Sequence, residues 1–256
     1  MSMSGVSESR LTVWPYLIAI TVFFISVMPV FAQVNFSDDE AAFLAAYPGL
    51  SHQDFSGSSV APVSQEICPA PANSTSDNVC FSPGDILPGI EFLNGPIISP
   101  PGDLFLVGTD FTGPGTPPGP ALNEGSIADN LEIVFDPGVT RVGLTLGCIV
   151  KGPCDADAEV VIFDANNFFL DSITVHVTSD FNTFLGISSQ TPIGNISLRN
   201  PDTETFLFKG VLNVWFGNGE RNVPTLSEWG MISAVAGLGL IGVFFAVRRR
   251  RASLDA

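Results

Sequence analysis

Apolar side chains alternate with polar or smaller ones along two stretches in the second half of the chain, 131–135 and 142–146. A period of two places alternate side chains on opposite faces of an extended strand, so each stretch predicts a β-strand with one buried face. Asp136-Pro137-Gly138 separates the two stretches and has a composition typical of a tight turn. This segment therefore predicts two strands around a turn.

Further short strands are expected on both sides of this segment, because apolar stretches recur between residues that favour turns. The clearest is a hairpin over 158–177 with its turn at Asp164–Asn167. One short amphipathic helix is expected early in the chain, capped by Ser37 and ended by Pro48-Gly49. The other expected strands, three or four of them in the last two segments, lie within 52–57, 89–93, 103–111, 181–200 and 204–218.

Two segments are expected to be loops without strands. Residues 57–88 are rich in Ser, Pro and Asn, and residues 112–125 are dominated by Pro and Gly. Regularly spaced short strands with little helical periodicity predict an all-β domain, a sandwich or a barrel rather than a parallel sheet. The domain is expected over 33–222, about 190 residues, which is enough for one hydrophobic core.

The chain is strongly acidic, with 26 Asp and Glu against 10 Lys and Arg and a formal net charge of −16 at pH 7. Such a surface repels phosphates, so no nucleic acid partner is expected. A G-x-G-x-x-G spacing at Gly237–Gly242 lies inside an apolar run close to the C-terminus. It lacks the strand and the acidic residue of a dinucleotide site, and no cofactor is expected.

The N-terminal segment 1–32 is expected to be a secretory signal peptide. An apolar run covers Leu11–Phe31, and the small residues Val30 and Ala32 have the spacing that signal peptidase accepts. Cleavage is expected between Ala32 and Gln33, with signal peptidase and the general secretion machinery as partners. An uncleaved anchor helix is the alternative, because the run is nearly long enough to span a bilayer.

A second apolar run lies near the C-terminus. Met231–Val247 contains 17 uncharged residues, about 26 Å of helix. Trp229 precedes it, and an arginine cluster follows and should stay cytoplasmic, so a transmembrane helix is expected that leaves 33–222 outside. A buried core helix is the alternative, and residues 252–256 are a short tail. The arginine cluster consists of Arg248, Arg249, Arg250 and Arg251.

The motif "VPTLSEWG" at 223–230 directly precedes this run. Motif, apolar helix and arginine cluster, together 223–251, closely resemble the IPTL-CTERM sorting signals of Gram-negative bacteria. That family motif begins Ile-Pro-Thr-Leu, and Val223 stands here in place of the Ile. The resemblance implies recognition by an exosortase-type membrane transpeptidase and a place in the cell envelope of a Gram-negative bacterium. The sorting-motif residues are Val223, Pro224, Thr225, Leu226, Ser227, Trp229 and Gly230.

The middle of the chain resembles the β-sandwich ectodomains found on PEP-CTERM and IPTL-CTERM surface proteins. The resemblance rests on patches: a helix such as "EAAFLAAYPGL", segments such as "FDPGVTRVGLTL" and "VVIFDANNFFL", and a final strand ending in Phe216-Gly217. It implies a jelly-roll-like β-sandwich and no defined activity. The ectodomain is then periplasmic or extracellular, and the chain passes through a single-pass intermediate in the inner membrane.

Four cysteines in an exported chain predict two disulfides, and three pairings are open to them. Local pairing, Cys68 with Cys80 and Cys148 with Cys154, is expected because each pair then closes a short loop. A zinc site is the alternative. Neither spacing is C-x-x-C and no histidine is near in sequence, so disulfides are favoured.

No catalytic residues are identified from the sequence. His176 is expected at an exposed strand position, and His52 lies in a turn without a recognisable nucleophile. Asp155, Asp157 and Glu159 share one face and are a candidate calcium site. Calcium takes six to eight oxygen ligands, so a solvated edge without metal is favoured.

The adjacent residues Phe168 and Phe169 point to opposite faces if both lie in a strand, which indicates that one is exposed. The expected function is a non-catalytic envelope protein that is structural or binds extracellular polysaccharide. A secreted carbohydrate-active enzyme on a β-sandwich is the alternative. Two carboxylates facing each other across an aromatic-lined cleft would favour the enzyme, and a closed convex sandwich would favour the structural role.

Overall fold

The structure is a computed structural model of the 256-residue chain. The expected signal peptide with its cleavage site at Ala32–Gln33, the sorting motif 223–230, the apolar run 231–247 and the arginine cluster 248–251 lie outside the described residues. Within the described part of the chain, no helix is both long enough and apolar enough to cross a membrane. The described residues are 34–95, 102–111, 113, 116–124, 130–149, 154–201 and 208–219.

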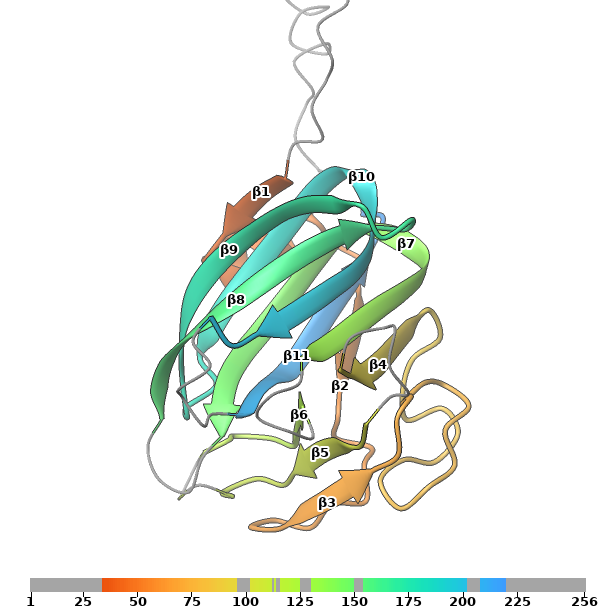
Figure 1. Cartoon of the computed structure of the whole chain (residues 1–256), viewed down its shortest axis with the longest axis vertical. Coiled ribbons are helices and arrows are strands. Elements are labelled where there is room, and N and C mark those ends of the chain that lie inside the picture. The colour runs from red at the N-terminus through yellow and green to blue at the C-terminus, as the bar shows by residue number, and fades with distance from the viewer. Residues whose placement is uncertain are drawn as a thin grey trace, which may run out of the picture.

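The described residues form antiparallel β-structure and one short helix, which confirms the expected all-β class. The strands are β1 (Val34–Ser37), β2 (Ser51–Asp54), β3 (Gln65–Cys68), β4 (Ile90–Asn94), β5 (Leu104–Val107), β6 (Ala121–Glu124), β7 (Leu131–Ile149), β8 (Asp155–Asp164), β9 (Phe169–Thr178), β10 (Thr183–Arg199) and β11 (Phe208–Gly217). They pair in the order β3-β5-β6-β11-β7-β10-β8-β9, with β1 on β10, β2 on β11 and β4 on β7. Figure 1 shows the long strands curving across one another in a sandwich-like body, with β3, β5 and β6 at one end.

Strand β7 is one continuous strand, so the hairpin expected around Asp136-Pro137-Gly138 was wrong. Both halves of β7 pair with β10: Val142 lies opposite Ile187, and Ile133 lies opposite Ile196. Between these pairs the register shifts in both strands. A bulge of this kind bends a strand without reversing it, and such bends let a strand pass from one layer of a sandwich to the next.

The bend brings β7 and β10 unusually close together at Gly138. A Cβ atom there would lie 3.1 Å from the carbonyl oxygen of Ile193 and 3.2 Å from the Cβ atom of Pro192. Pro192 sits in the matching bulge of β10, which therefore also continues as one strand. Within the described residues of 181–219, two long strands replace the three or four that were expected.

The early helix is present as α2 (Glu40–Ala46), but its cap differs from the prediction. The side chain of Asp39, not Ser37, accepts a hydrogen bond from the N–H of Ala42 at 2.9 Å. Phe43 is buried on the inner side of the helix, and a Cβ atom at Gly186 of β10 would lie only 2.5 Å from its ring. The helix therefore packs directly on the backbone of β10.

Two segments expected to be loops each contain a strand. Strand β3 lies within 57–88, and strand β6 lies within 112–125. Both pair with β5, and all four residues of β6 are buried. The prolines of the second segment end at Pro120, directly before β6 begins. The Pro- and Gly-rich composition therefore predicted the loop correctly but did not predict the short strand that follows it.

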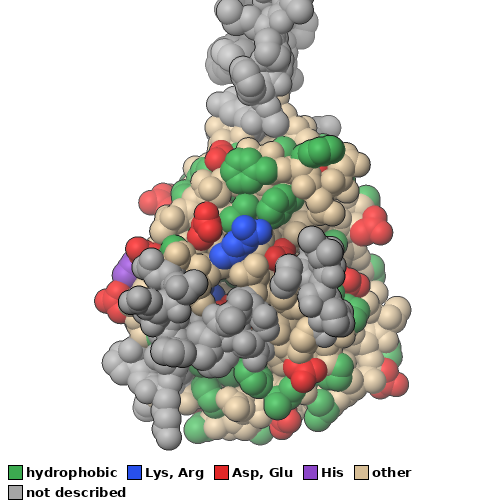
Figure 2. All heavy atoms as spheres, in the orientation of Figure 1, with side chains coloured by type: hydrophobic (Ala, Val, Ile, Leu, Met, Phe, Trp, Pro, Cys, Tyr) green, Lys and Arg blue, Asp and Glu red, His purple; other side chains and the backbone are tan. Residues whose placement is uncertain are grey.

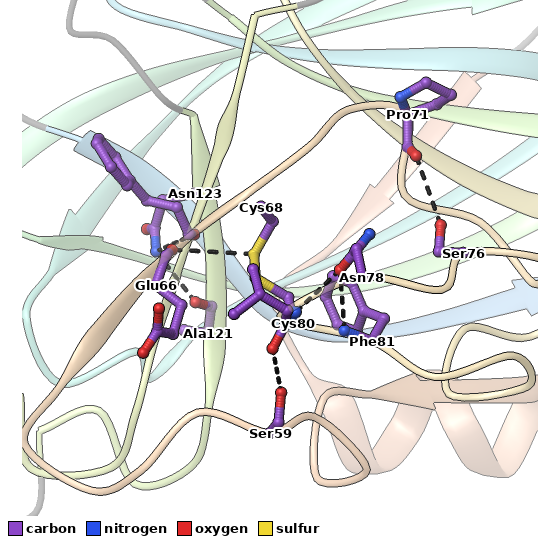
Figure 3. Close-up of a disulfide and its surroundings, with 12 residues drawn as sticks. Ser59, Glu66, Cys68, Pro71, Ser76, Asn78, Cys80, Phe81, Ala121 and Asn123 are labelled. Carbon is purple, nitrogen blue, oxygen red and sulfur yellow. Dashed lines mark hydrogen bonds between the residues drawn. A yellow bond between two sulfur atoms is a disulfide. The ribbon is translucent and has the colours of Figure 1, made fainter.

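The structure contains both local disulfides that were expected, Cys68–Cys80 and Cys148–Cys154. Cys80 is fully buried, and the side chain of Asn78 accepts hydrogen bonds from its N–H and from that of Phe81. Figure 3 shows this turn held against the β3 cysteine. The disulfide thus anchors the long segment 57–88 to the sheet, where regular hydrogen bonding is sparse.

Candidate functional site

One row of residues crosses five neighbouring strands on the face turned away from the core. Pairing in register places Glu91 of β4 beside Val134 of β7, then Asn195 of β10, Phe163 of β8 and Phe169 of β9. Because side chains alternate along a strand, all five project from the same face, which we call the outer face. On β4 and β7 the sequence neighbours of these residues, on the opposite face, belong to the hydrophobic core, as do Ile162 of β8 and Ile196 of β10.

Two adjacent depressions lie on the outer face, with volumes of about 450 Å³ and 360 Å³. Glu91, Val134 and Asp136 line both of them, so the two form one groove. Asp164, Asn167 and Asn195 are among the residues lining the larger part, and Asn73, Ser74 and Thr75 are among those lining the smaller. A groove between β4, β7, β10 and the β8–β9 turn is a surface that can hold an extended ligand.

Carboxylates dominate the charge of the groove. Glu91, Asp136 and Asp164 line it, and none of the described residues lining it is Lys or Arg. Glu91 accepts a hydrogen bond at Oε2 from Asn73 Nδ2 at 3.0 Å, which fixes its side chain across the smaller depression. The space-filling view shows acidic side chains spread over the visible face around a basic side chain at its centre (Figure 2).

Asp164 also holds the β8–β9 turn in shape. Its Oδ1 accepts hydrogen bonds from the N–H groups of Asn166 and Phe168, both at 2.8 Å. Asn167 adopts a left-handed backbone, with φ of 62°, a conformation that asparagine tolerates better than most residues. The hairpin and the turn expected at this position are confirmed.

A buried polar cluster lies next to the groove, centred on Glu132 of β7. Glu132 is only 3% exposed. Its Oε1 accepts a hydrogen bond from Ser197 Oγ at 2.6 Å, and its Oε2 accepts one from Asn195 Nδ2 at 2.8 Å. Arg199 Nε donates to Ser197 Oγ at 3.0 Å. Burial raises the pKa of Glu132, and the hydrogen bonds from Ser197 and Asn195 and the positive charge of Arg199 partly offset this effect.

Asn195 connects this cluster to the groove. The residue is 3% exposed and lines the larger depression. Its Nδ2 group is used by Glu132, whereas its buried Oδ1 accepts no hydrogen bond from any described residue. A buried acceptor without a donor is costly. Asn195 also lines the groove, so this unsatisfied oxygen lies directly behind the groove wall, where a small shift of the side chain would present it to a donor on a bound ligand.

Two exposed aromatic rings, which we call the aromatic border, directly follow Asn167, a residue of the β8–β9 turn that lines the groove. Phe168 and Phe169 are 69% and 61% exposed. The sequence pattern indicated only one exposed ring, but Phe168 lies in the turn and Phe169 opens β9, so both project outward. Phe163 packs edge-on against Phe169 at 6.4 Å, and the Arg199 guanidinium lies 5.6 Å from the Phe163 ring.

The candidate calcium residues Asp155, Asp157 and Glu159 lie at the far end of β8 from the groove. His176 of β9 lies between the first two, with Nε2 3.0 Å from Asp155 and Nδ1 3.3 Å from Asp157. Figure 2 shows a histidine beside acidic side chains at the edge of the molecule. Among the described residues, no group of three or more metal-binding side chains is arranged to hold an ion.

The other histidine has a packing role. His52 stacks on Trp215 with ring centroids 4.7 Å apart, and its Nε2 is 2.9 Å from Asn213 Oδ1. His176 is exposed on its strand, as expected.

Comparison of the chain with known proteins found no matching family model, curated protein or solved structure.

The groove residues were not identified from the sequence. Glu91, Asp136 and Asn195 lie on three strands, and nothing local in the chain marks them as neighbours. A signal did exist for Glu132: it is an acidic residue inside an otherwise apolar run, "NLEIVF". The residues expected to direct sorting and cleavage lie outside the described part of the chain, so they remain sequence-based predictions.

Proposed function

We propose that the protein is exported, held in the cell envelope of a Gram-negative bacterium, and binds extracellular polysaccharide without catalysing a reaction. The observation that carries the binding proposal is the groove together with the exposed rings of Phe168 and Phe169, which follow the lining residue Asn167 in the chain. Sugar rings present one apolar face and a rim of hydroxyl groups. They suit a surface that places exposed aromatic rings beside carboxylate and amide groups.

Export and retention are proposed from the sequence patterns at the two ends. Residues 1–32 serve as the signal peptide, 231–247 as a transmembrane helix oriented by 248–251, and 223–230 as the motif for an exosortase-type transpeptidase. The ectodomain 33–222 is then a jelly-roll-like β-sandwich outside the inner membrane. Two disulfides support this location, because disulfides persist in oxidising compartments.

Intact mass of the protein from the native envelope fraction, with the C-terminal peptide sequenced, tests the sorting proposal. A chain that ends within Pro224–Leu226, with or without added mass, supports processing. A chain that ends at Ala256 means that the tail is only an anchor, and the transpeptidase proposal fails.

Affinity electrophoresis tests the binding proposal. The protein is run through native gels that contain neutral, acidic or amino polysaccharides, with a protein of similar mass and charge as the control. Retardation by at least one polysaccharide, relative to the control, supports the proposal. Equal mobility in every gel would leave only a structural role for the ectodomain.

A carbohydrate-active enzyme is the second candidate, and Glu132 is the observation that favours it. Burial raises the pKa of this carboxyl group, as in many general acids. Release of reducing ends from polysaccharides that bind the protein, and its loss in Glu132→Gln, would favour the enzyme. Unchanged polysaccharide after prolonged incubation with the protein would favour the binding role.

A further inference from the structure

We propose that the ligand of the groove is a polysaccharide with free amino groups, a hexosamine polymer that lacks N-acetyl groups on many of its sugars. This inference rests on the proposed polysaccharide-binding function and names its ligand class. It follows from three features of the groove: its charge, an unsatisfied hydrogen-bond acceptor, and its aromatic border.

The charge of the groove selects against acidic ligands. Glu91, Asp136 and Asp164 line it, and none of its described lining residues is Lys or Arg. The whole chain carries a formal charge of −16. A uronic acid or a sulfated polymer would therefore be repelled, while a polymer with ammonium groups would be attracted before contact and at the site.

The polar groups of the groove need donors. Carboxylates accept hydrogen bonds and donate none, and Asn195 contributes an amide oxygen that accepts nothing from any described residue. The amide nitrogen of Asn195 is not available, because it donates to Glu132 at 2.8 Å. A charged amine offers three donors and no acceptor, which is the complement of this set.

An N-acetyl group fits this surface less well. It replaces the ammonium group by a neutral amide that has one N–H, an acceptor oxygen and a methyl group. The acceptor oxygen would face carboxylates such as Glu91, and the attraction between charges would be lost. The same reasoning favours an amino sugar over a neutral hexose, which offers hydroxyl groups but no positive charge.

The aromatic border favours a sugar over a lysine-rich peptide, which would also supply ammonium groups. Phe168 and Phe169 are each more than half exposed, and they directly follow Asn167, which lines the groove beside Asp164. A flat aromatic ring can cover the apolar face of a sugar ring, whereas the flexible lysine stem gains less from such a surface. The ring contact and the charge contact are then made by neighbouring parts of one ligand.

The test compares two ligands that differ in acetylation alone. The full chain, purified in a mild detergent, is titrated calorimetrically with a short β-linked glucosamine oligomer and with its fully N-acetylated counterpart. The glucosamine oligomer is expected to bind at least about tenfold more tightly than the acetylated oligomer. Added salt is expected to reduce this difference in affinity, because it screens exposed charges. A lysine oligomer of the same length is the third ligand and is expected to bind more weakly than the glucosamine oligomer.

Two variants locate the effect in the groove. Glu91→Gln and Asp136→Asn are each expected to weaken glucosamine binding roughly three- to tenfold and to leave binding of the acetylated oligomer unchanged. Asp180→Asn removes an equal charge at the other end of β9 and is the matched control, expected to bind like the parent chain.

The outcomes separate this inference from the function on which it rests. Equal or tighter binding of the acetylated oligomer would overturn the amino-sugar inference and leave polysaccharide binding in place. Equal or tighter binding of the lysine oligomer would also overturn it, because charge alone would then explain the affinity. No binding of either saccharide, in parallel with no retardation in any polysaccharide gel, would overturn both.

Discussion

Carboxylates gather at both ends of the β8–β9 hairpin, but their surroundings differ. At one end His176 lies between Asp155 and Asp157, at 3.0 and 3.3 Å, and we call these three residues the His176 cluster. At the other end Asp164 lines the groove together with two further carboxylates and with no described Lys or Arg. The first group includes a histidine that contacts both of its carboxylates, whereas the second has no described basic side chain among its lining residues.

The two ends also differ in what lies beneath them. The His176 cluster is solvent-exposed, and within the described part of the chain the hydrogen bonds and ion pairs of its side chains join only its own three members. The groove is backed by Asn195 and Glu132, both 3% exposed and hydrogen-bonded to each other. Acidic composition is therefore a poor guide to a site in this protein. The buried polar groups behind an acidic surface distinguish the groove from a solvated edge.

The largest expected effect comes from removing the carboxyl group of Glu132. Glu132→Ala leaves Ser197 and Asn195 without their acceptor and removes a negative charge that interacts with Arg199. The free energy of unfolding should fall by about 3 kcal/mol, which is typical when one partner is removed from a buried network of polar side chains. Asp155→Ala, the control in the His176 cluster, should change it by less than about 1 kcal/mol. Chemical denaturation of the full chain measures both, and similar values for the two variants would remove the distinction between the ends.

The pH dependence of stability gives the second prediction. Burial raises the pKa of Glu132 above its ordinary value of 4.5. Between the unfolded-state pKa of Glu132 and its raised folded-state pKa, the folded state binds more protons than the unfolded state. The free energy of unfolding therefore falls as pH rises through this range. The slope from one group is at most about 1.4 kcal/mol per pH unit. Below 4.5 both states are protonated, so the pH slope from this group vanishes and its contribution to stability is fully present.

Glu132→Gln provides the comparison for this measurement. The glutamine side chain cannot ionise, and its amide can still bond Ser197 and Asn195 if the Asn195 amide turns over. Unfolding free energies of the parent chain and the variant are measured at several pH values above 4.5. The variant should gain stability relative to the parent as pH rises, and a constant difference would show that Glu132 has an ordinary pKa.

The strands were predictable where the pattern is local, and the bends were not. The β8–β9 hairpin follows from alternation and from the turn at Asp164–Asn167. Pro137-Gly138 has an equally strong turn composition, yet β7 continues through it. The deciding interaction is pairing with β10, whose own bulge at Pro192 lies more than 50 residues away in sequence. A local pattern marks the break in regular structure but not the direction of the chain after it.

The site was less predictable than the fold, for a related reason. Both disulfides close short loops, so the cysteine pairing could be predicted from sequence separation alone. The groove joins Glu91, Val134 and Asn195, which meet only through strand register. Alternation correctly placed Glu132 on the face turned away from the core. It did not predict that Glu132 would be buried, because the contact of Glu132 with Ser197 depends on the same register.

The third prediction concerns the aromatic border, where the effect should fall on binding alone. Phe168→Ala is expected to weaken binding of the glucosamine oligomer roughly fivefold. Stability should be nearly unchanged, because the ring is 69% exposed. Val79→Ala, which also truncates an exposed apolar side chain, is the control. Calorimetric titration beside thermal unfolding separates the two quantities, and a loss of stability without a loss of affinity would remove Phe168 from the site.

The smallest expected effect comes from His176, and it tests whether the His176 cluster is a self-compensated surface. His176→Ala removes the imidazole that lies within 3.3 Å of Asp155 and Asp157 on the adjacent strand. Exposed pairs of this kind contribute at most about 1 kcal/mol, so the loss of unfolding free energy should be small. The loss should shrink as salt is added, because dissolved ions screen interactions between exposed charges. Affinity for the glucosamine oligomer should stay the same. A change in affinity comparable to that of Glu91→Gln would mean that the acidic surface acts as a whole, and that the groove has no privileged role in binding.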